Sequence, residues 1–118
     1  MKIGTDIIEI QRIHSLLEKY GDTFKNRFLT PDEIIFAKKV ESIAGLWAAK
    51  EAISKALGCG ISATLTFHDI HIFKNSKGAP YFTLSQKANR HYPINSASLS
   101  ISHDGGFAIA VVVIDLKK

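Results

Sequence analysis

Only one cysteine, Cys59, occurs among the 118 residues. A lone thiol cannot form an internal disulfide, which fits a reducing compartment. Long hydrophobic runs are also missing, since no apolar stretch approaches the roughly 20 residues that a membrane-spanning helix needs. A strand-like pattern begins within the first residues, with no signal peptide before it. We therefore expect a soluble, cytoplasmic protein that has no membrane partner.

Blocks of one charge are absent as well. Lysine and arginine number 15 against 11 acidic residues, which gives a net charge of +4 and a pI of about 9.3. The basic residues are spread along the chain and lack the clusters and interleaved aromatic residues of nucleic-acid-binding proteins, so we expect no nucleic-acid partner. The excess of positive charge favours an acidic partner, but charge alone fits a nucleotide as well as an acidic protein.

The chain contains no linker, internal repeat or low-complexity tract, so residues 1–118 are expected to form one domain. Its 46% hydrophobic and 22% charged residues are typical of a globular protein. A domain of this size buries roughly two-thirds of the surface of its chain. That leaves room for further burial in an oligomer.

Hydrophobic spacing predicts β-structure at both ends of the chain and helices between. The clearest local signal is Thr30-Pro31-Asp32-Glu33, in which a capping threonine, a proline at the first helical position and a glutamate at the third start a helix. The other predicted helices are 11–20, 41–57 and 85–91. The predicted strands are 2–9, 65–73, 80–84, 97–102 and 107–114. This order indicates an α+β fold.

One carboxylate stands inside the first apolar strand. Asp6 lies among isoleucines, where it caps a neighbouring backbone group, points to solvent at the strand end or binds a metal. Glu51 and Lys55 lie four residues apart on the predicted long helix, where a surface ion pair of about 0.3–0.5 kcal/mol is the simpler account. If the fold brings Asp6 to Glu51, however, the pair suits a Mg²⁺-bound polyphosphate, because Mg²⁺ takes one or two protein carboxylates plus phosphate oxygens and waters.

Four motifs follow one another along the chain. They are Gly4-Thr5-Asp6, Lys50-Glu51-Ala52-Ile53-Ser54-Lys55, Asn75-x-x-Gly78-x-Pro80 and Ser100-Ile101-Ser102-His103. In this order they resemble the holo-acyl-carrier-protein synthases, the stand-alone bacterial 4′-phosphopantetheinyl transferase family, over essentially the whole chain. The resemblance implies a 4′-phosphopantetheinyl transferase-like fold, in which a small antiparallel sheet packs with a long central helix and shorter helices.

The resemblance also implies an activity. Such an enzyme transfers the 4′-phosphopantetheine group from coenzyme A to a serine of apo-acyl carrier protein, releases adenosine 3′,5′-bisphosphate, depends on Mg²⁺ and supports fatty acid biosynthesis. Phosphoryl transfer relies mainly on positioning and on neutralising charge, which a metal and a lysine supply. The serine proton would pass either to Glu51 or to a water on the metal, and the sequence does not choose between them.

Roles for individual residues follow from the same resemblance. Asp6 and Glu51 would hold Mg²⁺ as catalytic residues, and Lys55 would contact the phosphates and help to neutralise the leaving group. The resemblance also places further residues around coenzyme A, namely Lys50, Ser54, Asn75, Gly78, Pro80 and His103. Arg12, and with it Arg27, would meet the acidic carrier protein. A homotrimer is implied too, with each active site at a subunit boundary and His103 acting across it.

Two other interpretations remain open. A small basic α+β oligomer that docks an acidic protein or nucleic acid without catalysis would explain the charge, and it would not need Asp6 or Glu51. A transferase that serves peptidyl or polyketide carriers is the other interpretation, although such enzymes are often about twice as long because the unit is duplicated. His68 and His71 do not indicate a zinc site, since a spacing of three points them to opposite faces of a strand.

Overall fold

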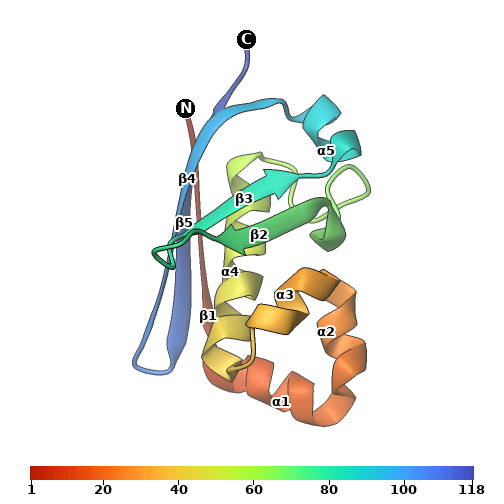
Figure 1. Cartoon of the computed structure of the whole chain (residues 1–118), viewed down its shortest axis with the longest axis vertical. Helices are drawn as coiled ribbons and strands as arrows, with labels where there is room; N and C mark the ends of the chain where they lie inside the picture. The colour runs from red at the N-terminus through yellow and green to blue at the C-terminus, as the bar shows by residue number, and fades with distance from the viewer.

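The computed structural model describes all of residues 1–118 as a mixture of antiparallel strands and helices (Figure 1). The strands are β1 (Lys2–Glu9), β2 (Ile70–Lys74), β3 (Pro80–Leu84), β4 (Ile94–Asp104) and β5 (Phe107–Leu116). The helices are α1 (Ile10–Tyr20), α2 (Asp22–Phe28), α3 (Pro31–Phe36), α4 (Val40–Ala56), the short 3₁₀ helix η1 (Phe67–Asp69) and α5 (Gln86–His91). This confirms the α+β class. No helix has both the length and the apolar character needed to cross a membrane.

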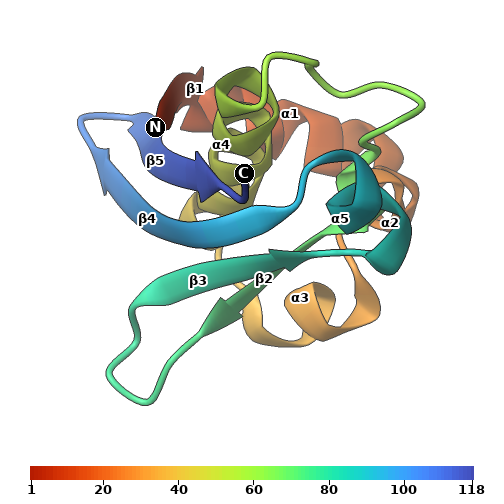
Figure 2. The same cartoon turned by 90° about the horizontal axis from the view of Figure 1, so that it is seen from above.

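The strands form two separate antiparallel sheets. The larger has the order β1-β5-β4, so the first strand of the chain pairs with the last, and the smaller is the β2–β3 hairpin. Seen from above, α4 stands between the larger sheet and the remaining helices, and the hairpin runs alongside β4 (Figure 2). The fold is therefore built around one central helix, as the resemblance implied.

Helix α4 touches the larger sheet closely because two glycines remove the side chains that would keep them apart. A Cβ atom on Gly4 of β1 would lie 2.0 Å from the carbonyl oxygen of Ala52. A Cβ atom on Gly45 of α4 would lie 2.9 Å from Cγ2 of Ile101 on β4. Backbone cannot give way as a flexible side chain can, so β1 reaches its position only with glycine at residue 4.

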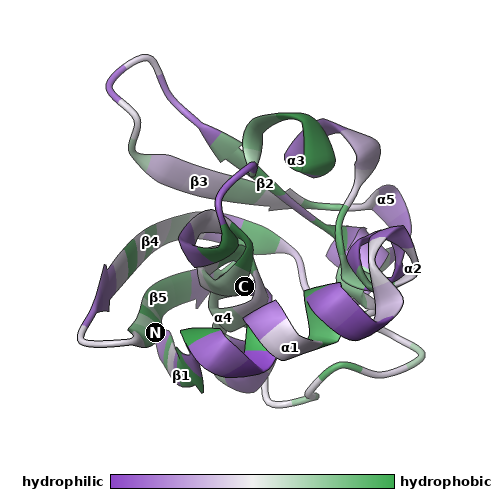
Figure 3. Cartoon of the chain, turned by 90° about the horizontal axis from the view of Figure 1, so that it is seen from below, coloured by the Kyte–Doolittle hydropathy of each residue, from purple (hydrophilic) through white to green (hydrophobic).

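The short helices α1–α3 cover the other side of α4. Helix α1 presents alternating polar and apolar stripes, with its polar side outward (Figure 3), and Ile13 is its buried residue. Helix α3 starts with the predicted capping box, since Thr30 Oγ1 accepts from the Glu33 N–H and Glu33 accepts from the Thr30 N–H.

The structure corrects several predicted boundaries. The predicted strand 65–73 is wrong in its first half, because Thr66 and Asp69 form a second capping box that turns this segment into η1. Helix α2 was not predicted at all, although Phe24 and Phe28 have helical spacing and are both buried. The final hairpin is longer than predicted, while β1 and β3 begin and end where the sequence placed them.

Candidate active site

Strand β1 and helix α4 bring the first motif to the second. Gly4, Asp6 and Ile8 alternate onto the face of β1 that meets α4. Lys55, near the end of α4, donates to Asp6 Oδ1 at 2.7 Å and to the Thr5 carbonyl oxygen at 3.3 Å. The close approach that Gly4 permits is therefore what joins the two distant motifs.

Glu51 lies one helical turn before Lys55 and completes the cluster. Burial raises the pKa of the Glu51 carboxyl, the negative charge of Asp6 raises it further, and Lys55 partly offsets both effects. Two carboxylates thus lie close enough to repel each other, beside a single ammonium group. We call Asp6, Glu51 and Lys55 the carboxylate–lysine cluster.

This cluster fits a divalent cation. Both carboxylates are hard oxygen ligands of the kind that Mg²⁺ prefers, and a cation between them would relieve the repulsion that raises the pKa of Glu51. No group of three or more metal-ligating side chains occurs in the chain. The two carboxylates would therefore leave most of the coordination shell to a ligand and to water, as Mg²⁺ sites with bound phosphates do.

Two residues expected around coenzyme A lie in the interior instead. Lys50 has no exposed side-chain surface, and its ammonium group donates to Glu33 Oε1 at 2.8 Å. Ser54 is equally buried, and its hydroxyl donates to the Glu51 carbonyl oxygen at 2.7 Å. Neither side chain has the free surface that contact with a ligand requires. The sequence did not predict that Glu33 pairs with Lys50, because a capping glutamate is usually exposed.

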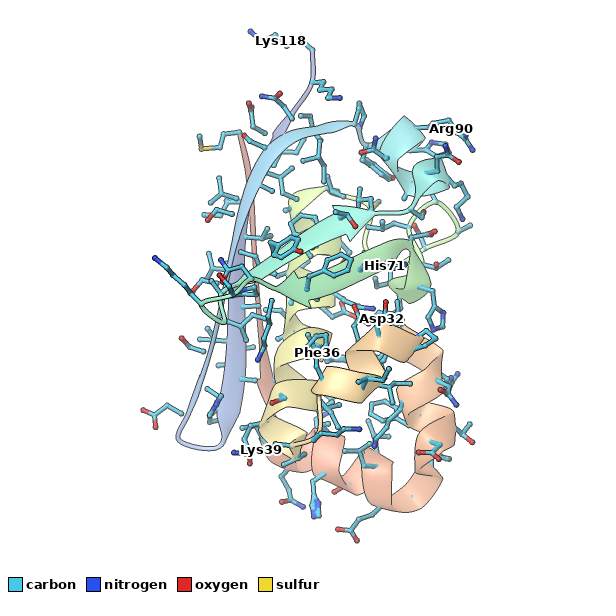
Figure 4. The ribbon with its side chains drawn as sticks, viewed as in Figure 1. Asp32, Phe36, Lys39, His71, Arg90 and Lys118 are labelled. Carbon is cyan, nitrogen blue, oxygen red and sulfur yellow. The ribbon has the colours of Figure 1, made fainter.

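A second group of expected residues gathers elsewhere. Gly78, Pro80 and His103 share the wall of a cavity of about 210 Å³, which also touches Ser42 and Leu46 in the first half of α4. Lys74 reaches the same cavity from the hairpin and lies over the ring of Phe36, 5.8 Å from its centroid; Phe36 projects from α3 beside the hairpin (Figure 4).

Asn75 stabilises its own loop and does not reach into that cavity. Its side-chain oxygen accepts from the backbone N–H groups of Lys77 and Ala79, at 2.9 and 3.0 Å. Gly78 has a φ of 84°, a left-handed conformation that favours glycine. Asn75 and Gly78, two of the three residues of the third motif that the resemblance placed around coenzyme A, thus hold the hairpin turn in shape.

The two arginines expected to meet a carrier protein are both exposed, Arg12 on α1 and Arg27 on α2. Arg27 borders an apolar cavity of about 460 Å³ whose other lining residues are Leu16, Tyr20, Phe24, Phe28, Trp47 and Phe67. Sequence reasoning missed this aromatic cavity. Its signals were the helical spacing of Phe24 and Phe28 and the position of Trp47 four residues before Glu51.

Comparisons with known proteins agree with one another. The family model described as the 4′-phosphopantetheinyl transferase superfamily matches residues 2–112. The holo-[acyl-carrier-protein] synthase of Sulfurovum sp. is 67% identical over 117 residues, covering 99% of this chain and 98% of that protein. The synthase of Wolinella succinogenes is 53% identical over 116 residues, covering 98% of each.

Solved structures give the same result. The Helicobacter pylori holo-[acyl-carrier-protein] synthase, crystallised in complex with coenzyme A, has a TM-score of 0.93 at 50% identity, covering 96% of this chain and 99% of that one. The synthase of Neisseria meningitidis has a TM-score of 0.88 at 36% identity, with 97% of each chain covered.

Proposed function

Because this chain belongs to the 4′-phosphopantetheinyl transferase superfamily and is a phosphopantetheinyl transferase of the holo-[acyl-carrier-protein] synthase type, we propose that it modifies an apo-acyl carrier protein. It transfers the 4′-phosphopantetheine group of coenzyme A to a carrier serine and releases adenosine 3′,5′-bisphosphate. The carboxylate–lysine cluster is the observation that carries this proposal, because it places two metal ligands and a phosphate-binding ammonium group together.

Coenzyme A is the proposed phosphopantetheine donor. The H. pylori relative binds it, and that relative aligns with 96% of this chain. In the reaction the serine hydroxyl oxygen attacks the phosphorus next to pantetheine, the bond from that phosphorus to the bridging oxygen breaks, and the serine proton is released. Negative charge then builds on the departing bisphosphate, and it must be neutralised.

Each member of the cluster has a role in this chemistry. Asp6 and Glu51 would hold Mg²⁺, which when bound offsets the negative charge of the pyrophosphate. Lys55 is more than half exposed, at 54%, whereas Asp6 is only 13% exposed. The ammonium group is therefore free to turn from Asp6 to a phosphate oxygen, while Asp6 keeps a fixed position against α4.

The enzyme is proposed to act as a homotrimer. The carboxylate–lysine cluster lies at the edge of α4 nearest β1, whereas Gly78, Pro80 and His103 lie around the first half of α4. One chain therefore supplies the parts of the site in two separate places, and a neighbouring copy can unite them at a subunit boundary.

The outer face of the larger sheet supports such an assembly. It exposes a row of large apolar side chains, of which the most exposed are Ile3 at 67% and Ile7 at 57%; the others are Phe107, Ile109 and Val111. An apolar sheet face of this kind normally packs against another layer. A second copy of the chain would cover it.

The proposed carrier surface includes Arg12, Arg27 and the aromatic cavity beside Arg27. Exposed arginines attract an acidic protein and set its orientation. We further propose that the whole chain, residues 1–118, is one domain that works in the cytoplasm and serves fatty acid biosynthesis.

Intact mass of an apo-acyl carrier protein, incubated with this protein, coenzyme A and Mg²⁺, tests the proposal. We expect a gain of one phosphopantetheine, about 340 Da, which disappears when a chelator removes the metal. Asp6→Asn should give no gain, and Asp32→Asn, an exposed carboxylate on α3, should behave as the wild type. If the carrier mass stays unchanged while a known transferase modifies the same sample, the proposal is wrong and a non-catalytic binding module takes its place.

A further inference from the structure

Lys50 is the one fully buried lysine of the chain, and the proposed reaction does not use it. Its ammonium group donates three hydrogen bonds, to the Phe28 carbonyl oxygen at 2.7 Å, to Glu33 Oε1 at 2.8 Å and to the Phe67 carbonyl oxygen at 3.0 Å. An ammonium group has three N–H donors. Every donor is therefore occupied inside the protein, and none is left for a phosphate.

Glu33 extends the same network to other segments. Its Oε1 also accepts from the Thr30 N–H, and its Oε2 accepts from the Ile72 N–H of β2, both at 2.8 Å. The Lys50–Glu33 pair thus holds backbone groups from the end of α2, the start of α3, η1 and β2 against α4. No buried polar side-chain atom of the chain lacks a partner, so the network is complete.

Burying a charged pair is costly, and apolar residues of similar volume often serve stability equally well. Stability alone therefore does not explain why the chain has a buried ion pair at this position. Its specific effect is to hold two carbonyl groups, those of Phe28 and Phe67, at fixed places beside α4. Burial lowers the pKa of Lys50, and the charge and hydrogen bond of Glu33 oppose that shift.

The rings of those two residues form the aromatic cavity. The Phe28 and Phe67 rings each lie 5.1 Å from the Trp47 ring, centroid to centroid, and all three line the cavity beside Arg27. Trp47 precedes Glu51 by four residues, so the two share a face of α4. Lys50 therefore fixes the cavity relative to the helix that carries a proposed metal ligand.

We infer that Lys50 is a positioning residue: it does not touch coenzyme A, but it sets the carrier-docking surface formed by Arg27, Trp47 and Phe67, with the buried Phe28 packed beneath it, at the correct place relative to Glu51. This inference rests on the proposed function for the identity of the carrier. The placement of Phe28 and Phe67 by Lys50 is independent of that identity.

The test compares Lys50→Met with Lys55→Met, two lysines of the same helix. Coenzyme A affinity is measured by calorimetry with Mg²⁺, and the kcat and the KM for the carrier are measured by transfer assay. We expect Lys50→Met to bind coenzyme A within about twofold of the wild type and to raise the carrier KM by about tenfold or more, since small misplacements of a binding surface are costly. Lys55→Met should instead weaken coenzyme A binding.

Trp47 is the only tryptophan, so its fluorescence reports on the cavity directly. We expect a shifted emission maximum and lower anisotropy in folded Lys50→Met, and neither change in Lys55→Met. If Lys50→Met does not fold, Lys50→Arg keeps the charge but cannot reproduce all three bonds, and the same measurements are made on it.

Three results would overturn the inference. They are weakened coenzyme A binding like that of Lys55→Met, a lower kcat with an unchanged carrier KM, and unchanged Trp47 emission. If the wild type itself transfers nothing, the proposed function fails, and the coenzyme A and fluorescence measurements still decide whether Lys50 holds the cavity.

Discussion

Helix α4 supplies the lysines of two lysine–carboxylate pairs, Lys50 and Lys55, and the two pairs differ chiefly in burial. Lys50 and Glu33 are 0% exposed and lie 2.8 Å apart, whereas Lys55 is 54% exposed and lies 2.7 Å from Asp6. The chemistry and the distance are nearly the same in the two pairs. Their surroundings give them opposite uses.

The two pairs differ in how easily one partner can be replaced by a ligand. The Lys50–Glu33 pair is closed by further hydrogen bonds to Phe28, Phe67 and Ile72, so breaking it leaves a buried charge unpaired. In the Lys55–Asp6 pair the ammonium group is more than half exposed, and screening by solvent keeps the contribution of such a pair smaller than that of an enclosed one. A phosphate or a metal can therefore replace one partner at little cost, which suits a catalytic site.

The largest expected effect is that of Glu51→Gln on the transfer rate, through the carboxylate–lysine cluster. Removing this carboxylate removes a proposed metal ligand and one of the two candidate acceptors of the serine proton, and we expect the transfer rate to fall by about 10²–10⁴-fold, the range typical of a lost acid–base group. The fold should remain. Intact-mass kinetics on the carrier measure the rate, with Asp32→Asn as the control, and a rate within threefold of the wild type would contradict the assignment.

Glu33→Leu should disrupt the buried Lys50–Glu33 pair. It leaves Lys50 enclosed without its counter-ion, and we expect the free energy of unfolding to fall by about 3–5 kcal/mol. Denaturant unfolding measures the loss. Asp32→Leu is the matched control, because Asp32 is the exposed neighbour of Glu33 at the start of α3 (Figure 4). Equal losses in both variants would show that the Lys50–Glu33 pair contributes no more to the free energy of unfolding than an exposed carboxylate.

Gly4→Ala should disturb the exposed pair through the backbone. The added Cβ would meet the Ala52 carbonyl oxygen, so β1 must move away from α4 and carry Asp6 with it. We expect a loss of about 1–3 kcal/mol in unfolding free energy, as overpacking typically causes, together with slower transfer. Lys2→Ala, on the same strand and exposed, is the control. Unchanged transfer in a destabilised Gly4→Ala would mean that the spacing of β1 does not matter for catalysis.

The smallest expected effect is the pH dependence of stability. Burial, followed by the charge of Asp6, raises the pKa of Glu51, so the folded state holds this proton more tightly than the unfolded state. The resulting stability is complete below the unfolded pKa of about 4.3 and is lost as the pH rises through the folded value.

Glu51→Gln keeps that stability at every pH. In metal-free, low-salt buffer its melting temperature should therefore match the wild type at low pH and exceed it at neutral pH. Adding MgCl₂ should raise the melting temperature of the wild type more than that of the variant. Identical curves at all pH values would show that Asp6 and Glu51 do not repel each other.

Local signals in the sequence predicted much of the fold. The capping box at Thr30 and Glu33 was confirmed, and the alternating patterns of β1 and β3 gave the correct bounds. Residues 65–69 were mispredicted because Asp69 binds Thr66 and Ser85; the Thr66-x-x-Asp69 spacing is visible in the sequence, whereas the contact with the distant Ser85 is not. Those hydrogen bonds overcome the opposing effect of burial and lower the pKa of Asp69 to about 2.

The candidate site was predicted in part. Helical periodicity predicted that Glu51 and Lys55 share one face of a helix. Whether Asp6 lies beside them depended on how β1 packs against α4, which the sequence does not give and the structure does. The resemblance placed Lys50 and Ser54 around coenzyme A together with them. One residue on a helix turns the side chain by about 100°, and that rotation carries Lys50 into the interior while its neighbour Glu51 stays at the site.

The sequence by itself determined most of the elements, the family and the residues able to bind a metal and phosphates, because these depend on local spacing and on residue chemistry. The tertiary structure alone decided which lysine is free and which is enclosed. That choice depends on what packs around α4, namely Phe28, Glu33 and Phe67 at one lysine and the exposed edge of β1 at the other. Burial fixes the cost of parting two charges, and contacts between segments distant in the chain determine burial.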